Sequence, residues 1–244
     1  MDLGRPRDLR ELFRDSLLLY GRHFGLFLLI AVAVVAPVQL VVSGIGLEEL
    51  TSAYREDTSL ARTGIPTAVS FLVATPLITV AIISALGALA KGERPGAGRS
   101  LQAALDVFTP LFGAVVLAAA GIALGLVAFV LPGIYVAVRW YFVTQTMAID
   151  GVRGTNALAR SWDTVQDAFW RTLGILLLAN LATALPGILI LTPLTALAEA
   201  ADREAVVLVG EIVTESLTTP FIALVSTLLY YDLRVRKASV PPVA

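Results

Sequence analysis

Three charged side chains lie in stretches that are otherwise apolar, and they are the strongest candidates for chemistry. Arg139 lies in one apolar segment, and Glu211 and Glu215 lie together in another. Ionised groups inside a membrane are costly, so each needs a partner or a function. Residues four apart share one helical face. Two glutamates at this spacing repel each other, and one of them could hold a proton. This arrangement is typical of a proton-coupled site.

Each of these side chains also has a simpler interpretation. Arg139 precedes Trp140 and Tyr141, so its guanidinium could reach an aromatic belt at the membrane surface. The sharper hypothesis is a buried Arg139–Glu211 ion pair, with Glu215 nearer the midplane. In the simpler alternative, Ala200–Ser216 is partly an extracellular amphipathic helix, and the sixth span begins near Ile212. Both carboxylates then lie in or near water.

Lone amides and glycines in the apolar segments suggest contacts between helices. Gln39, Gln145 and Asn180 are predicted to form interhelical hydrogen bonds rather than to contact a substrate. Gly121 and Gly125 stand four residues apart, a spacing that lets two helices approach closely. The glycines could pack inside this chain or form a dimer face.

The composition is that of a protein embedded in a membrane. Hydrophobic residues make up 57% of the 244 residues and charged residues 15%, and the mean hydropathy is +0.82. A soluble domain would be about 25% charged. The net charge of −1 gives no excess of cations for a nucleic-acid partner. With no cysteine and one histidine, we expect no metal site, no cofactor and no thiol or histidine-based catalysis.

Six segments are long and apolar enough to be predicted as membrane spans. A span needs about 20 apolar residues to cross a hydrocarbon core about 30 Å thick. The sequence therefore predicts an all-α integral membrane protein, a single membrane domain over residues 1–244. It divides into an N-terminal amphipathic segment (1–23), a six-span bundle (24–231) and a tail (232–244). The predicted spans are Phe24–Ile45, Ile65–Ala90, Pro110–Leu131, Gly133–Ile149, Thr172–Ala198 and Ala205–Tyr231.

The basic residues predict the orientation. They gather in the N-terminal segment, in alternate loops and in the tail, whereas the other loops hold only Arg55, Arg62 and Arg203. Positive charge marks the cytoplasmic side. We therefore expect a multi-pass protein of the bacterial cytoplasmic membrane with both termini cytoplasmic. The residues on the basic side are Arg5, Arg7, Arg10, Arg14, Arg22, Lys91, Arg94, Arg99, Arg153, Arg160, Arg171, Arg234, Arg236 and Lys237.

Three cytoplasmic segments carry an apolar stripe at helical spacing directly before a span. They cover residues 9–24, 101–108 and 158–169, the second with Ser100 as a predicted N-cap. Such helices lie in the membrane interface or pack on one another as ordinary cytoplasmic helices. Leu131–Ile134 recurs as Leu185–Ile188. We therefore predict three repeated units, each an interfacial helix followed by a two-span hairpin.

Several motifs in the second half of the chain resemble a known bacterial family. They are Leu131–Tyr135, Arg139-Trp140, Asp150-Gly151, Ala157–Trp162, Phe169–Arg171 and Tyr230–Arg236. The chain resembles the membrane-domain family of glycerophosphoryl diester phosphodiesterases and its uncharacterised six-span actinobacterial relatives. In this chain Asp150 stands where a glutamate is usual. The resemblance implies a six-span membrane fold. The phosphodiesterase domain itself is a separate soluble unit, and its activity is not carried over.

Three functions follow from these observations. The first is a non-enzymatic accessory, scaffold or membrane-homeostasis protein that contacts membrane lipids, with a protein partner or a second copy of itself left open. The second is a small transporter or a lipid or solute permease that uses Arg139, Glu211 and Glu215. The third, an intramembrane enzyme acting on lipid, lacks a nucleophile–base pair. A polar cavity lined by Arg139 and Glu215 would favour the second function, and a dry bundle the first.

Overall fold

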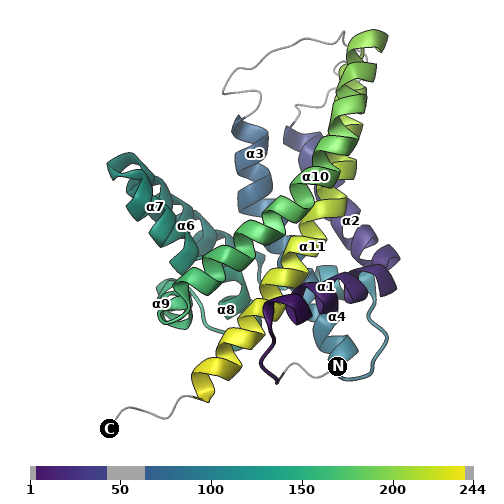
Figure 1. Ribbon diagram of the computed structural model, residues 1–244. Coiled ribbons are helices and arrows are strands. Elements are labelled where there is room, and N and C mark those ends of the chain that lie inside the picture. The colour runs from purple at the N-terminus through teal and green to yellow at the C-terminus, as the bar shows by residue number, and fades with distance from the viewer. Residues whose placement is uncertain (1–3, 43–63, 240–244) are drawn as a thin grey trace.

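The computed structural model describes residues 4–42 and 64–239. Every regular element in these two ranges is a helix, as the composition predicted (Figure 1). In chain order they are α1 (Leu9–Arg22), α2 (Phe24–Val42), α3 (Ile65–Val69), the π-helical turn η2 (Ser70–Ala74), α4 (Thr75–Ala90), α5 (Ala97–Asp106), α6 (Phe108–Ala128), α7 (Val130–Arg139), α8 (Val143–Asp150), α9 (Thr155–Val165), α10 (Phe169–Ala201) and α11 (Glu204–Ala238).

Within the described ranges, five helical segments are long and apolar enough to cross a membrane. They are Phe24–Val42, Thr67–Ala90, Phe108–Ala128, Phe169–Ala201 and Glu204–Ala238. Each corresponds to a predicted span. The predicted end of the first span, at Ile45, lies outside the described residues.

The fourth predicted span, Gly133–Ile149, is wrong as one continuous helix. The chain instead forms α7 and α8, separated at Trp140–Phe142. Ser161 of α9 explains how the break is stabilised. Its hydroxyl donates to the Arg139 carbonyl at 2.8 Å and accepts from the Phe142 N–H at 3.1 Å. Backbone groups freed at membrane depth must be satisfied by protein, and a single side chain satisfies two of them here.

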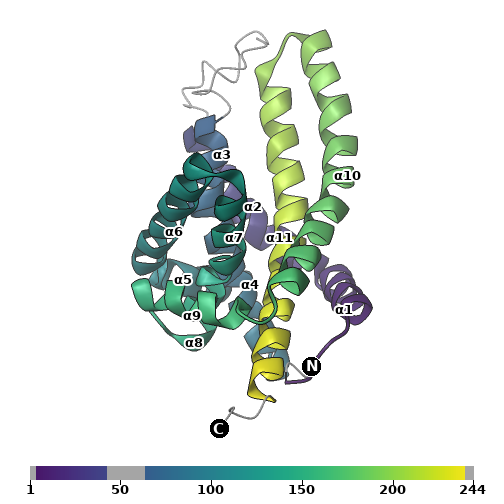
Figure 2. The same cartoon turned by 60° about the vertical axis from the view of Figure 1, so that its left-hand side comes forward.

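A short amphipathic helix precedes a long helix three times. His23 separates α1 from α2, Val107 separates α5 from α6, and Gln166–Ala168 separate α9 from α10. The short helices end before the predicted stripes do, because Phe24, Phe108 and Phe169 each begin the following long helix. Figure 2 shows α1, α5 and α9 at the same end of the molecule, beside α8 and the C-terminal end of α11. This order is compatible with three units, and their origin as repeats stays a prediction.

The predicted N-cap of the second short helix is wrong. α5 begins at Ala97, three residues before Ser100, and the extended Gly96 is its N-cap. The Ser100 N–H donates to the Gly96 carbonyl at 3.0 Å and closes the first turn. Ser100 itself is buried inside the helix.

The apolar core forms around α4, and the outer helices expose apolar side chains. Most of α4 from Pro76 to Leu86 is buried, and α4 packs against α2, α5, α8 and α11. The α6–α7 hairpin, by contrast, exposes Val127 at 86% and Leu131 at 79%. Apolar surface of this kind has lipid as its natural solvent. The exposed stripes therefore fit the membrane-spanning assignment.

Prolines lie inside the long helices without ending them. Pro37 lies in α2, Pro186 and Pro193 in α10, and Pro220 in α11. Pro76 instead lies in the first turn of α4, directly after η2. A proline removes one helical donor, and a π-turn is one way in which a helix accommodates the loss. Ser70 lies in this turn, and its hydroxyl donates to the Glu215 carboxylate of α11.

Candidate functional site

Glu215 is the centre of a polar cluster built by three segments of the bundle. Its Oε2 accepts a hydrogen bond from Gln39 Nε2 of α2 at 2.8 Å. It also accepts one from Ser70 Oγ of η2 at 3.3 Å. Gln39 Nε2 and Ser70 Oγ lie 3.3 Å apart. The carboxylate is thus held by neutral donors, and the cluster ties α2 and η2 to α11.

The structure does not place Glu211 beside Arg139, so the predicted ion pair is wrong. Glu211 is exposed on α11, and the side chain of Arg139 has other partners. Glu211 lies 21 residues before Asp232, or about 32 Å along the helix. A hydrocarbon core is about 30 Å thick. With the C-terminal end of α11 at one membrane surface, this spacing favours a position for Glu211 near the opposite surface.

Arg139 is a buried cation held by aromatic rings and a carbonyl. It lies in the last turn of α7 and is only 7% exposed. Its Nε and Nη2 donate to the Tyr135 hydroxyl at 3.0 and 2.5 Å, and its Nη1 donates to the Trp162 carbonyl at 3.1 Å. The guanidinium carbon lies 5.0 Å from the Tyr135 ring centre and 4.9 Å from that of Trp162. Such stacking stabilises a cation. Arg139 therefore joins α7 to α9.

The two other amides predicted as interhelical contacts behave differently. Gln145 Nε2 on α8 donates to Ser226 Oγ on α11 at 3.1 Å, so it makes an interhelical hydrogen bond of the expected kind. Asn180 Nδ2 donates to the Leu176 carbonyl at 2.8 Å, within its own helix. Because Asn180 satisfies a donor locally on an exposed face of α10, it needs no partner helix.

The glycine pair on α6 packs inside the chain. A Cβ on Gly121 would collide with the Trp140 ring, and one on Gly125 would lie 3.0 Å from the Gly133 Cα of α7. Of the two interpretations of this motif, the structure favours close packing of the α6–α7 hairpin. The glycines let the bulky side chain at the α7–α8 break lie against α6.

A buried carboxylate that the sequence analysis gave no role, Asp232, joins three parts of the chain. It is 0% exposed. Its Oδ2 lies 3.0 Å from Arg171 Nη2 at the start of α10 and 3.0 Å from Arg236 Nε one turn along α11. Its Oδ1 accepts from the Arg7 N–H at 2.7 Å. Both guanidinium groups also donate to the Arg7 carbonyl, at 2.6 and 2.9 Å. These contacts fix the N-terminal segment against α10 and α11.

Asp150 forms a second carboxylate cluster at the same end of the bundle. It lies at the C-terminal end of α8, and its side chain is 7% exposed. Its Oδ2 accepts from the Tyr230 hydroxyl at 2.7 Å and from Arg160 Nε at 3.2 Å. Its Oδ1 lies 2.9 Å from Arg234 Nη1. The cluster therefore links α8, α9 and α11.

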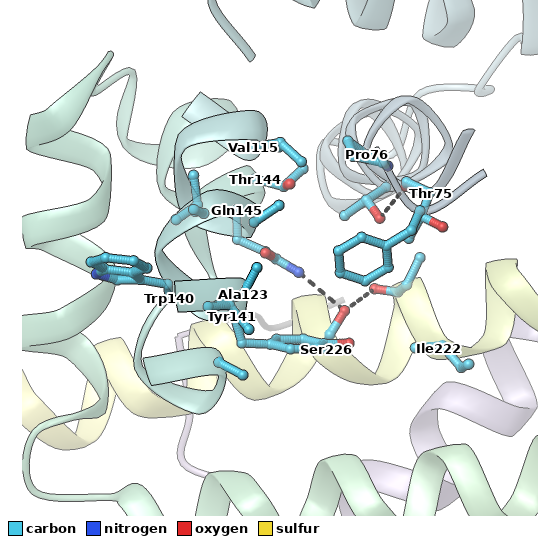
Figure 3. A pocket seen from close by; sticks show the side chains of 18 of the residues that line it. Thr75, Pro76, Val115, Ala123, Trp140, Tyr141, Thr144, Gln145, Ile222 and Ser226 are labelled. Atoms are coloured by element: carbon cyan, nitrogen blue, oxygen red, sulfur yellow. Dashed lines mark hydrogen bonds between the residues drawn. The ribbon is translucent and has the colours of Figure 1, made fainter. Parts of the chain in front are cut away.

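An apolar cavity of about 480 Å³ lies between α4, α6, the α7–α8 break and α11. Alanine, valine, isoleucine and leucine side chains form most of its wall. Figure 3 shows Gln145 reaching across its base toward Ser226. Arg139 and Glu215 do not line this cavity. This cavity is therefore not the polar cavity, lined by Arg139 and Glu215, that would favour a transport function.

A comparison with known families identifies the second half of this architecture. Residues 111–240, more than half of the chain, match a family described as the membrane domain of glycerophosphoryl diester phosphodiesterase. The chain belongs to this family. The resemblance found in the sequence motifs is thereby confirmed. No curated protein and no solved structure matches the chain.

The family segment contains most of the polar geometry described above. It begins in α6 and extends through α11. It thus includes the Arg139 contacts, the Asp150 cluster, all of the Asp232 cluster except Arg7, and three of the four walls of the cavity. Gln39 and Ser70 lie before it, so the donors to Glu215 come from outside the part of the chain that matches the family. One signal could have identified Asp232 from the sequence: Arg236 follows it at the i,i+4 spacing of a helical ion pair.

Proposed function

We propose that this member of the family is a non-enzymatic accessory or scaffold protein of the bacterial cytoplasmic membrane. The observation that carries this proposal is the Asp232 cluster. A group that binds or transforms a substrate must face that substrate or a cavity that holds it. Asp232 instead directs its carboxylate at two arginines and a backbone amide of the same chain. Asp150 is engaged in the same way.

The alternative of a permease that uses Arg139, Glu211 and Glu215 together has little geometric support. Arg139 contacts Tyr135 and Trp162 on one side of the bundle. Glu215 contacts α2 and η2, and Glu211 is exposed. A transport path that relied on all three would need them to face one continuous polar space. Among the described residues, Glu215 is the one member of this set that accepts hydrogen bonds from neutral donors inside the membrane-spanning bundle.

Native mass spectrometry of the chain, extracted in mild detergent from its own membrane, tests the scaffold proposal. We expect a protein companion at a fixed integer ratio, retained in two detergents of different chemistry. A companion present at variable ratios, or lost in one detergent, would be a contaminant. A chain that appears alone or only as a homo-oligomer in both detergents contradicts the proposal.

We further propose that both termini are cytoplasmic and that α7 and α8 together make the fourth crossing. The chain has no cysteine, so single cysteines can be labelled without background. The exposed positions are Arg14 in α1, Asn156 in α9, Ala201 at the α10–α11 turn and Ser239 after α11. We expect an impermeant maleimide applied outside intact cells to label Ala201→Cys alone. Labelling of Asn156→Cys from outside would contradict the fourth crossing.

A further inference from the structure

The apolar cavity has a closed polar end and a mouth on the surface of the bundle. Gln145 and Ser226 at its base are each only 2% exposed. At the other end, Phe71 of η2 and Leu126 of α6 are exposed at 58% and 44%. Both segments belong to membrane-spanning helices. The mouth therefore opens sideways, toward lipid rather than toward bulk water.

The wall between base and mouth is mostly apolar, and its polar side chains are those of Thr75, Thr79, Tyr141 and Thr144. On the α6 side it consists of an aliphatic stripe that includes Val115, Ala119 and Ile122. On the α4 side, the Thr79 hydroxyl donates to the Thr75 carbonyl at 2.7 Å and is already used. A buried water needs two to four polar partners. An apolar space of this size is instead within the range of sites that bind small hydrophobic molecules.

The base of the cavity holds one acceptor that lacks a donor. Gln145 Nε2 donates to Ser226 Oγ at 3.1 Å, and Ser226 Oγ donates to the Ala223 carbonyl at 3.1 Å. The Ser226 hydroxyl and one of the two N–H groups of Gln145 Nε2 are therefore used. Gln145 Oε1 is buried and has no hydrogen-bond partner within residues 4–42 and 64–239. A ligand with a hydroxyl group would supply the missing donor, because a carbonyl oxygen can only accept.

The position of this acceptor suits a lipid that lies parallel to its neighbours. Gln145 is five residues from Asp150, about 7.5 Å along α8. Asp150 belongs to the charged end of the bundle, where Arg160 and Arg234 bind it. A lipid placed there has its polar head close to one membrane surface. Its chain follows the α6 stripe toward the interior and leaves between Phe71 and Leu126.

We propose that the cavity binds the single aliphatic chain of a lipid that has a hydroxyl head, such as a monoacylglycerol. The hydroxyl donates to Gln145 Oε1, and the chain occupies the apolar space along α6. This inference goes beyond the scaffold proposal and does not depend on it, because a scaffold can hold such a lipid or lack one.

The test uses a long-chain alcohol with a photoreactive diazirine in its chain, and the methyl ether of the same alcohol. The full-length protein is reconstituted in phosphatidylcholine vesicles, irradiated and mapped by peptide mass spectrometry. We expect saturable labelling by the alcohol, confined to peptides of η2, α4, α6, α7, α8, the α7–α8 break and α11, which line the cavity. The ether, which cannot donate, should bind on the order of tenfold more weakly. Unlabelled monoacylglycerol should compete, and a fatty acid methyl ester of equal chain length should compete on the order of tenfold less well.

Neighbouring alanines on α6 give matched variants. Ala119 lines the cavity, whereas Ala120 is exposed on the outside of the helix. We expect Ala119→Trp to abolish the saturable labelling and Ala120→Trp to leave it intact. Gln145→Met should remove the preference for the alcohol over the ether.

Three results would overturn the proposal: labelling that does not saturate and spreads over all exposed helices, equal binding of alcohol and ether, or equal effects of the two tryptophans. The comparison of the two probes is made on the unaltered chain, so it decides the matter even where a tryptophan variant fails to fold. A protein companion in native mass spectrometry has no bearing on it.

Discussion

Replacement of Asp232 by alanine is expected to destabilise the folded chain by about 3 kcal/mol, the lower end of the usual cost of breaking a buried ion pair by removing one partner, because both arginines are partly exposed. The variant leaves the guanidinium groups of Arg171 and Arg236 facing the same carbonyl of Arg7 with no anion between them. Asp232 is fully buried, whereas the side chains of Arg171 and Arg236 are 29% and 41% exposed. The two like charges brought to one acceptor repel each other, and water screens part of this repulsion.

Unfolding in mixed micelles of dodecyl maltoside and increasing dodecyl sulfate measures this loss. Asp167 provides a matched control, because it is an exposed aspartate just before α10, at the same end of the bundle as Asp232. Asp167→Ala should unfold at the wild-type midpoint. If Asp232→Ala unfolds at the same midpoint as Asp167→Ala, the cluster does not hold the N-terminal segment, α10 and α11 together.

A second substitution separates the loss of charge balance from the loss of packing. Removal of a complete buried ion cluster is often nearly neutral, because the cost of desolvating the charges is removed with them. We therefore expect Arg171→Met to recover part of the stability that Asp232→Ala loses. An additive effect of the two substitutions would mean that repulsion between the arginines is not the cause.

The long helices could be predicted from the sequence because their signal is local. About 20 consecutive apolar residues identify a span without any knowledge of its neighbours. The fourth span shows where this signal ends. Residues 133–149 are apolar enough, yet α9 supplies Ser161 to the backbone at Arg139 and Phe142. Ser161 follows Phe142 by 19 residues and Arg139 by 22 residues. Its contacts with both residues decide where the helix breaks, and hydropathy carries no information about them.

The polar contacts were harder to predict than the helices, for a related reason. The sequence identifies Arg139, Glu211 and Glu215 because they interrupt apolar segments. It does not reveal which side chains face them. Glu215 finds Gln39 at a separation of 176 residues and Ser70 at 145 residues. Such partners depend on how the helices are arranged around α11. Matching depth alone paired Glu211 with Arg139, whose guanidinium is held by Tyr135 and Trp162.

Substitution of Arg139 by methionine is the second change for which we expect a large effect, a destabilisation of about 1–3 kcal/mol. Methionine keeps much of the apolar volume but removes the donors to the Tyr135 hydroxyl and the Trp162 carbonyl. It also removes the cation above two aromatic rings. Relief from burying a charge offsets part of this loss, so the effect should be smaller than that of Asp232→Ala. The same unfolding measurement in mixed micelles applies, with the exposed Arg153→Met as the control.

A double-mutant cycle shows whether the tyrosine hydroxyl and the guanidinium act together. Tyr135→Phe removes only the hydroxyl. If the geometry is right, the double variant Arg139→Met/Tyr135→Phe should cost less than the sum of the single variants, because the shared contact is lost only once. Exchange of charges between Arg139 and Glu211 is an independent check. The guanidinium is held by α7 and α9 rather than by α11, so Arg139→Glu/Glu211→Arg should not rescue Arg139→Glu. A rescue would restore the ion pair that the spacing of the charges first suggested.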